Sequence, residues 1–275
     1  MTLEIRDGDG VEKHIRTLGV GSEADPYRNF TVGYSYLDAV GAGEVSGACQ
    51  FNSYGAADLS AGNGHDVWEG PTTTQPIPPD GGIQMQLVSS SAQDSAAGTG
   101  IRTVNLHLVL EDGSEYEEVV TLNGVTPVNT VKTDIRWCNR MHAATVGSTG
   151  SAVGDVTMES VGGATVYHQI SATGNQTLSC AKMVPGGKVL YINSFAASQS
   201  ATTKTSIRLR STSDNGDLYP GVFLFKSAIN LRQSAQTIPF SPPISIPAMA
   251  IVKVSNWSEG ASEVAANWSG WLQNV

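Results

Sequence analysis

The sequence predicts an all-β protein with a β-sandwich, jelly-roll-like domain at its C-terminal end. Short segments in which apolar and polar residues alternate are separated by turns rich in Gly, Asn and Asp, and Gly alone occurs 30 times. Charged residues make up 15% of the chain, below the roughly 25% of ordinary soluble domains. A chain of 275 residues can bury more than one core. We therefore expect an irregular N-terminal arm, a β-rich middle domain and a C-terminal sandwich.

Residues 1–80 are the least regular part and are expected to form the arm or linker. A short helix is expected near Val11–Leu18 and a weak strand at Thr31–Leu37. Gly and Ala are frequent over Val40–Gly64, and the Pro-rich stretch Pro71–Gly82 cannot pair with neighbours on both sides.

The middle domain, residues 81–162, contains the clearest strand of the chain, Thr103–Leu110, in which every second residue is apolar. A three-residue loop that ends at Gly113, with that glycine in the left-handed conformation, sets Leu108 opposite Tyr116. A two-residue loop would instead oppose this leucine to a glutamate. The three-residue loop is preferred because it keeps both apolar faces together.

This register has further consequences along the hairpin. His107 falls opposite Glu117 on the outer face, where a polar pair is expected. Glu118 falls on the apolar face, which predicts either a bulge or a position at the rim of the sheet. Asn123-Gly124 predicts the next tight turn, and Pro127 suits an edge strand.

In the C-terminal domain, residues 163–275, about seven strands are expected, and short turns separate them. Within one of them Ile207 and Leu209 are predicted to face inward and Arg208 and Arg210 outward. The seven segments are Thr177–Val184, Lys188–Ala197, Lys204–Arg210, Gly221–Ala228, Gln236–Ile246, Ala250–Trp257 and Val264–Leu272.

Three tryptophans near the C-terminus and two arginines are the candidate contacts with a partner. Trp268 and Trp271 point to opposite faces of one strand unless a bulge intervenes, so one can fill the core and the other cannot. An exposed tryptophan then serves either partner binding or local packing. The candidate assembly contacts are Trp257, Trp268, Trp271, Arg208 and Arg210.

No arrangement of residues predicts a reaction. The sequence has no phosphate-binding loop and no HExxH or GxSxG motif, and its five histidines are scattered. The acidic hairpin, Glu111 to Glu118, could hold a glycosidase carboxylate pair, but a charged tip that blocks edge pairing is preferred. We expect a protein that is not an enzyme, with no catalytic, cofactor-binding or metal-binding residues and no cofactor.

The three cysteines, the first residues and the lengths of the apolar segments indicate the compartment in which the protein is made. Cys49, Cys138 and Cys180 are far apart and form no CxxC pair, so buried free thiols in a reducing cytoplasm are expected. The first residues lack the features of a signal peptide, and no segment approaches the roughly 20 apolar residues of a membrane span. We expect a soluble protein with no membrane partner.

The net charge of −9 is unevenly distributed. Residues 1–80 carry 12 acids and 4 bases, residues 81–160 carry 9 and 4, and residues 161–275 carry 4 and 8. The acidic front part argues against nucleic acid as a partner. The asymmetry is compatible with head-to-tail contact between unlike surfaces, or with two surfaces that are solvated independently.

Three segments of the middle domain resemble virion structural proteins of tailed bacteriophages: Ser89–Val104, Leu122–Val128 and Gly147–Val156. The resemblance covers roughly residues 80–160. It implies a capsid decoration or cement protein that stabilises the phage head by bridging capsid subunits. The implied partners are the major capsid protein or other virion proteins, together with further copies of the chain, a trimer being favoured. The implied location is the phage capsid, after assembly in the host cytoplasm.

Two alternatives stay open within this resemblance. The first is a structural component of the neck or tail, since virion proteins at those positions share the pattern. The second is a carbohydrate-binding module of a tail fibre, because β-sandwiches bind glycans through paired aromatic residues and the C-terminal tryptophans supply such residues.

Overall fold

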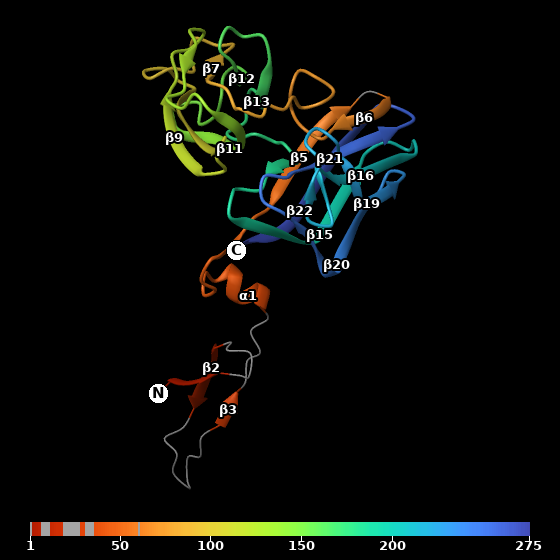
Figure 1. Cartoon of the computed structure of the whole chain (residues 1–275). Helices are drawn as coiled ribbons and strands as arrows, with labels where there is room; N and C mark the ends of the chain where they lie inside the picture. Colours follow the sequence, from red (N-terminus) through yellow and green to blue (C-terminus); the bar gives the residue numbers. More distant parts are fainter. Residues whose placement is uncertain (1, 7–11, 19–27, 31–35, 60) are drawn as a thin grey trace. The chain divides into compact units, whose positions relative to one another are not determined.

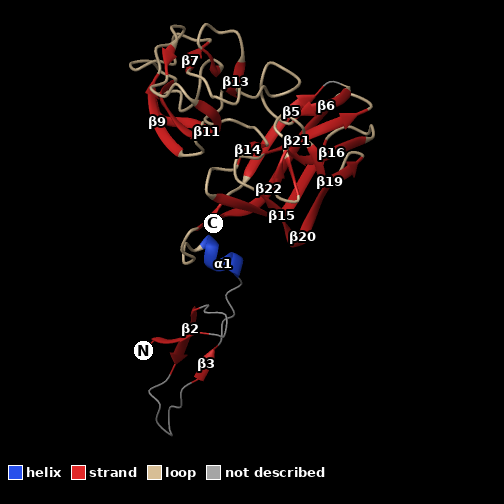
Figure 2. Cartoon of the chain, in the orientation of Figure 1, coloured by secondary structure: helices blue, strands red, loops and turns tan. Residues whose placement is uncertain are grey.

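The computed structural model describes residues 2–6, 12–18, 28–30, 36–59 and 61–275, which divide into two compact units, Met1–Ser46 and Gly47–Val275 (Figure 1). Strands predominate throughout, and the all-β prediction is confirmed (Figure 2). No helix in these described ranges is long and apolar enough to span a membrane.

The first unit contains a three-stranded antiparallel sheet, β1–β2–β3, followed by one short helix, α1. The helix expected near Val11–Leu18 is wrong, because residues 12–18 form a strand that pairs on both sides. Of the strand expected at Thr31–Leu37, residues 31–35 lie outside the described part, and α1 begins at residue 36. The elements are β1 (Thr2–Arg6), β2 (Glu12–Leu18), β3 (Arg28–Phe30) and α1 (Tyr36–Gly41).

The second unit is built from strands alone, and all seven strands predicted in the C-terminal domain are present within a few residues of their expected bounds. They are β4 (Ala48–Gln50), β5 (Ser53–Leu59), β6 (Gly62–Asp66), β7 (Met85–Ser89), β8 (Ile101–Leu110), β9 (Glu115–Thr121), β10 (Val128–Asn129), β11 (Ile135–Val146), β12 (Val156–Ser160), β13 (Val166–Ile170), β14 (Ala181–Met183), β15 (Lys188–Gln199), β16 (Thr205–Ser211), β17 (Ser213–Asp214), β18 (Asp217–Leu218), β19 (Leu224–Leu231), β20 (Ala235–Ile246), β21 (Ile251–Ser258) and β22 (Ser262–Asn274).

These strands form two lobes. In the first lobe, β7 to β13, the sheets β10–β7–β12–β13 and β11–β8–β9 contribute to one buried apolar cluster. In the second lobe, β4 to β6 with β14 to β22, a larger cluster draws on the sheets β14–β21–β16–β19 and β20–β15–β22–β4. Taken together, the four sheets suggest a four-bladed, propeller-like arrangement rather than the predicted jelly roll, although each core is shared by two sheets.

The lobes do not follow the predicted division at residues 80 and 162. Strand β5 pairs with β22 and β6 pairs with β21, so part of the predicted arm belongs to the second lobe. Val67, which follows β6, is buried in the core of that lobe. At the other boundary, β13 pairs with β12 and extends the first lobe beyond residue 162. The sequence hid these pairings because β5 and β6 contain five glycines and alanines in a weakly apolar pattern.

The hairpin of β8 and β9 has the predicted register. Leu108 pairs with Tyr116, and His107 pairs with Glu117, whose carboxylate lies 3.1 Å from the imidazole Nδ1. Gly113 has a φ of 82°, as the three-residue loop requires. The pairing of β8 with β9 has no register shift, so the bulge offered for Glu118 is wrong.

Glu118 is instead accommodated in a buried position, 8% exposed, where its carboxylate accepts a hydrogen bond from the backbone N–H of Val131 at 2.8 Å. The turn predicted at Asn123-Gly124 is confirmed by the hydrogen bond from the N–H of Thr126 to the carbonyl of residue 123. Strand β10, directly after Pro127, is an edge strand as predicted.

Loops at one end of the first lobe converge on Asp94, which is completely buried. One carboxylate oxygen accepts the N–H groups of Ile101 at 2.8 Å and Val153 at 3.0 Å. The other accepts the hydroxyl of Ser89 at 2.6 Å and the N–H of Gly154 at 2.8 Å. A single side chain therefore replaces the backbone hydrogen bonds that these loops cannot make with each other.

The two lobes meet across a small apolar cluster to which both contribute. Beside it, the side-chain amide of Asn139 bonds both the N–H and the C=O of Met183, each at 2.9 Å. These contacts hold β11 of the first lobe against β14 of the second. The cluster contains Val109, Trp137, Ala181, Met183 and Ile251.

The Pro-rich segment 71–82 is packed between the lobes rather than free, through the buried side chain of Gln75. Its amide nitrogen donates to the carbonyl of Tyr167 at 2.9 Å and lies 3.2 Å from Nδ1 of His168. Its amide oxygen accepts the hydroxyl of Ser179 at 2.6 Å. The expectation that this segment belongs to an arm or linker is therefore corrected.

The cysteines carry free thiols, as predicted. Burial raises the pKa of Cys138 and of Cys180 to about 12, which keeps both thiols protonated and unreactive. Cys49 is exposed, so the expectation of a buried thiol is wrong there.

Candidate interaction surface

The outward face of β16 and of its neighbour β21 carries a group of arginine, lysine and aromatic side chains. The predicted alternation is confirmed, since Ile207 and Leu209 are completely buried in the core and Arg208 and Arg210 lie on the opposite face. Because β21 runs antiparallel to β16, its outward residues extend the same face.

Trp257 on β21 lies beneath both arginines. The guanidinium carbon of Arg208 is 4.0 Å from the centroid of its ring, and that of Arg210 is 4.9 Å away. Both distances are within the range of cation–π attraction. The indole ring therefore holds the two guanidinium groups in place and leaves less of its own face open for stacking.

A second aromatic ring continues the row. Phe223, just before β19, has the ammonium of Lys253 4.0 Å from its ring centroid and the guanidinium carbon of Arg210 at 5.4 Å. Three cations thus lie over two rings. Arg208, Arg210, Lys253, Phe223 and Trp257 are called the cationic surface below.

One buried carboxylate, that of Asp66, balances part of this charge. It accepts hydrogen bonds from the ammonium of Lys253 at 2.8 Å, from Arg210 at 3.4 Å and from the hydroxyl of Ser255 at 2.5 Å. The backbone N–H of Gln75 also donates to it, at 2.9 Å. Two of the three cations share this carboxylate, and Arg208 has no carboxylate partner among the described residues, so the surface has an excess of positive charge.

Because these cations are partly buried, the excess of positive charge is unfavourable in free energy. Burial lowers the pKa of Lys253 and of Arg210, while the neighbouring carboxylate of Asp66 opposes the shift in each case. The guanidinium of Arg208 hydrogen-bonds, among the described residues, only the hydroxyl of Ser206, through Nε at 3.3 Å. Its terminal nitrogens are therefore available to bind a carboxylate in two-point fashion.

Exposed apolar side chains border the cationic surface. From the end of β18, through the loop that includes Phe223, to the start of β19, four large side chains are between 43% and 61% exposed. Sequence reasoning missed this feature, although the run Leu218-Tyr-Pro-Gly-Val-Phe-Leu-Phe could have indicated it. The four residues are Leu218, Tyr219, Val222 and Phe225.

The other two candidate tryptophans do not belong to this surface. Trp268 is completely buried in the core of the second lobe, 5.9 Å from the ring of Phe51. Trp271 points to the opposite face of β22, as predicted, and is 8% exposed because it stacks on Tyr191 at 5.2 Å. Their assignment as partner contacts is corrected, since packing within the chain covers both.

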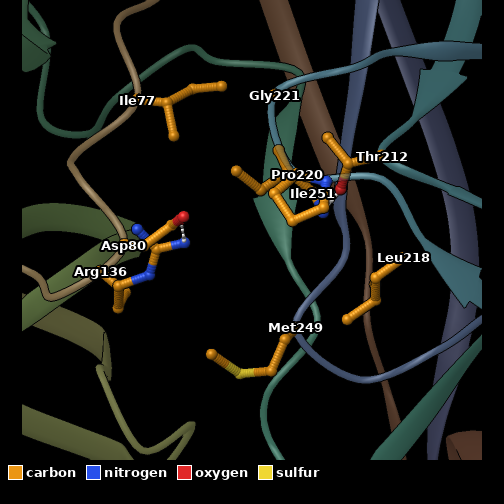
Figure 3. Close-up of a pocket in the computed structure, with 9 residues that line it drawn as sticks. All are labelled: Ile77, Asp80, Arg136, Thr212, Leu218, Pro220, Gly221, Met249 and Ile251. Carbon is orange, nitrogen blue, oxygen red and sulfur yellow. Dashed lines mark hydrogen bonds and ion pairs between the residues drawn. The ribbon is translucent and has the colours of Figure 1, made fainter.

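A pocket of about 100 Å³ lies between the lobes (Figure 3). Its one arginine, Arg136, is already engaged, with Nη2 2.9 Å from Asp80 and Nη1 donating to the carbonyls of Pro78 and Pro79. The remaining lining is mostly apolar. This arrangement fastens the Pro-rich segment to β11 and leaves few donors for a ligand. The lining residues are Ile77, Asp80, Arg136, Thr212, Leu218, Pro220, Gly221, Met249 and Ile251.

The acidic hairpin and the histidines form no metal site within the described ranges, where no group of three His, Cys, Asp or Glu side chains is placed to hold an ion. The search against known proteins found no family model and no curated protein that matches the chain. What the surface binds must therefore be argued from its own chemistry.

Proposed function

We propose that this chain is a structural protein of a tailed-bacteriophage virion, which decorates the head and bridges capsid subunits. The resemblance of Ser89–Val104, Leu122–Val128 and Gly147–Val156 to such proteins carries the proposal. Decoration of this kind needs no reaction. It works through repeated contacts, each of moderate strength, that together lock a shell.

The arrangement of these three segments supports their reading as one structural element. Asp94, in the first segment, accepts N–H groups of Val153 and Gly154 in the third. Its carbonyl accepts the N–H of Gly124, in the second, at 2.8 Å. Segments dispersed over the middle of the sequence thus form one hydrogen-bonded loop cluster. This favours a shared structural motif over a chance similarity in small residues.

The composition of the cationic surface and its border supports binding to another protein. Arginine and aromatic residues are enriched where protein interfaces are fully desolvated, and exposed apolar side chains add area to such contacts. A standard interface buries about 1,600 Å² in total, which a protein decorating a shell can reach through several smaller contacts.

For the second lobe by itself we propose a two-sheet β-sandwich, set within the propeller-like arrangement of the four sheets. Along the chain, β14, β16, β19 and β21 fall in one five-stranded sheet and β15, β20 and β22 in the other. The buried cluster of the second lobe draws on both. Repeated crossing between two sheets that share a core supports this assignment.

The two alternatives differ in their support. A position in the neck or tail shares every feature above and differs in copy number. A carbohydrate-binding module has less support, because Trp268 and Trp271 are covered within the chain and the ring of Trp257 is partly covered by two guanidinium groups.

A shell-binding experiment tests the proposal. The full chain is expected to bind capsids assembled without it and to reach saturation. A variant that begins at Gly47 keeps the second compact unit and is expected to stay folded, but to bind more weakly if residues 1–46 contact the shell. Failure of the full chain to bind shells would contradict the proposal. Undiminished binding by the shortened variant would move the shell contact to the second unit.

A further inference from the structure

A second surface of the same unit has the opposite charge. Strand β9 is the edge strand of the sheet β11–β8–β9, and its outward residues Glu115, Glu117 and Val119 are exposed. Glu111 and Asp112 in the adjoining turn are also exposed. These five residues are called the acidic surface below.

The acidic surface keeps an excess of negative charge after its local partners are counted. Lys188 pairs with Glu115, and His107 pairs with Glu117, whose side chain remains 68% exposed. Lys132 lies 4.6 Å from the ring centroid of Tyr116. Arg140 of β11 is exposed and pairs across from His107 on the same face. Four carboxylates therefore face two lysines, one arginine and one histidine, which leaves one carboxylate in excess of the lysines and the arginine. Val119, 60% exposed, gives this surface an apolar element as well.

We propose that the acidic surface of one copy binds the cationic surface of a second copy, so that the protein self-associates head to tail. Each surface supplies what the other lacks: exposed carboxylates on β9, and on β16 guanidinium groups held by an aromatic ring. Both also present exposed apolar side chains, whose burial adds to the attraction.

The location of the two surfaces fixes the kind of contact. They lie on different lobes of the second unit, and Figure 1 shows β9 and β16 well apart. A contact between unlike surfaces is heterologous, so it either closes into a ring or continues as an open array. A closed ring of three copies would agree with the trimer that the resemblance implies.

Electrostatics gives the contact its driving force. In the single copy, Arg210 and Lys253 are largely removed from water, and the one carboxylate they share in the described part of the chain is that of Asp66. A carboxylate from a second copy compensates the remaining charge. This inference does not rest on the proposed function, since it concerns the isolated protein.

Sedimentation velocity of the full chain over a range of concentrations, in low and high salt, tests the inference. Species larger than the monomer are expected to grow with concentration and to weaken with salt. Arg208→Glu and Glu117→Arg are each expected to weaken self-association at least tenfold, because each places like charges together. The double variant again places opposite charges together, and it is expected to recover most of the self-association. Arg232→Glu, at an exposed arginine that belongs to neither of the two defined surfaces, serves as the control.

Circular dichroism establishes that each variant is folded, and Arg208→Gln and Glu117→Gln replace any charge-reversed variant that is not. A monomeric parent at every concentration would overturn the inference. Single variants that self-associate as strongly as the parent would also overturn it. A folded double variant that does not recover self-association would do the same. If the monomeric parent binds a poly-glutamate peptide through Arg208, the cationic surface belongs to an acidic partner of another kind and self-association is rejected.

Discussion

Asp94→Ala is expected to lower the free energy of unfolding by about 3–5 kcal/mol. The change removes the acceptor of three backbone N–H groups, from Ile101, Val153 and Gly154, in and around a completely buried site. Each buried donor left without a partner costs about 1–3 kcal/mol, and water that enters the space recovers part of the loss. Urea-induced unfolding of the full chain measures the effect.

Asp155 provides the matched control for this experiment. It is the next acidic residue in the same loop cluster, but it is exposed and accepts a backbone N–H from Ala172 at 2.9 Å. Asp155→Ala is expected to cost about 1 kcal/mol or less. Similar losses for both variants would show that Asp94 does not hold the loops together. The structural support for the resemblance would then be lost.

Acid is expected to destabilise the junction between the lobes through His168. Burial lowers its pKa to about 3, with the nearby ammonium of Lys182 as a second cause, and its Nδ1 faces the amide nitrogen of Gln75. The folded protein therefore keeps the ring neutral. In the unfolded chain the ring is protonated below its ordinary pKa of about 6.5.

The sign and size of the effect follow from this difference. Between about pH 6.5 and about pH 3, the unfolded state binds one more proton at His168 than the folded state. Stability is fully present above about 6.5 and falls by up to about 1.4 kcal/mol for each pH unit below it. Denaturant midpoints at several pH values measure the slope.

Two variants separate this contribution from that of the carboxylates. His168→Gln is expected to flatten the slope between pH 6.5 and 4, even if the variant is less stable at neutral pH. His107→Gln, on the outer face of β8, is the control for replacing a histidine by glutamine. An equal slope in the parent and in His168→Gln would show that the histidine is not buried in its neutral form.

Local patterns predicted local structure well. The alternation in Thr103–Leu110 and the glycine at residue 113 determined the register of the β8–β9 hairpin, because side-chain period and turn geometry act over few residues. The inward and outward faces of β16 followed from the same period.

Long-range pairing was not predictable in the same way. Strands β5 and β6 pair with β22 and β21, which lie more than a hundred residues later in the chain, and no local signal in Gly62–Asp66 indicates β21 as the partner of β6. Part of the cationic surface could be predicted from the sequence. Arg208, Arg210 and Trp257 were named from the sequence, whereas Lys253, Phe223 and the buried Asp66 became visible only when β6, β16 and β21 were placed side by side.

The composition of purified virus particles tests the proposed function most directly. Quantitative mass spectrometry gives the number of copies per particle, and an averaged electron-microscopy image of particles carrying a labelled chain gives their position. A head-decorating protein is expected in on the order of hundreds of copies, placed over the junctions between capsid subunits. About a dozen copies or fewer at one vertex would assign the chain to the neck or tail, and its absence from the particle would contradict a structural role in the virion.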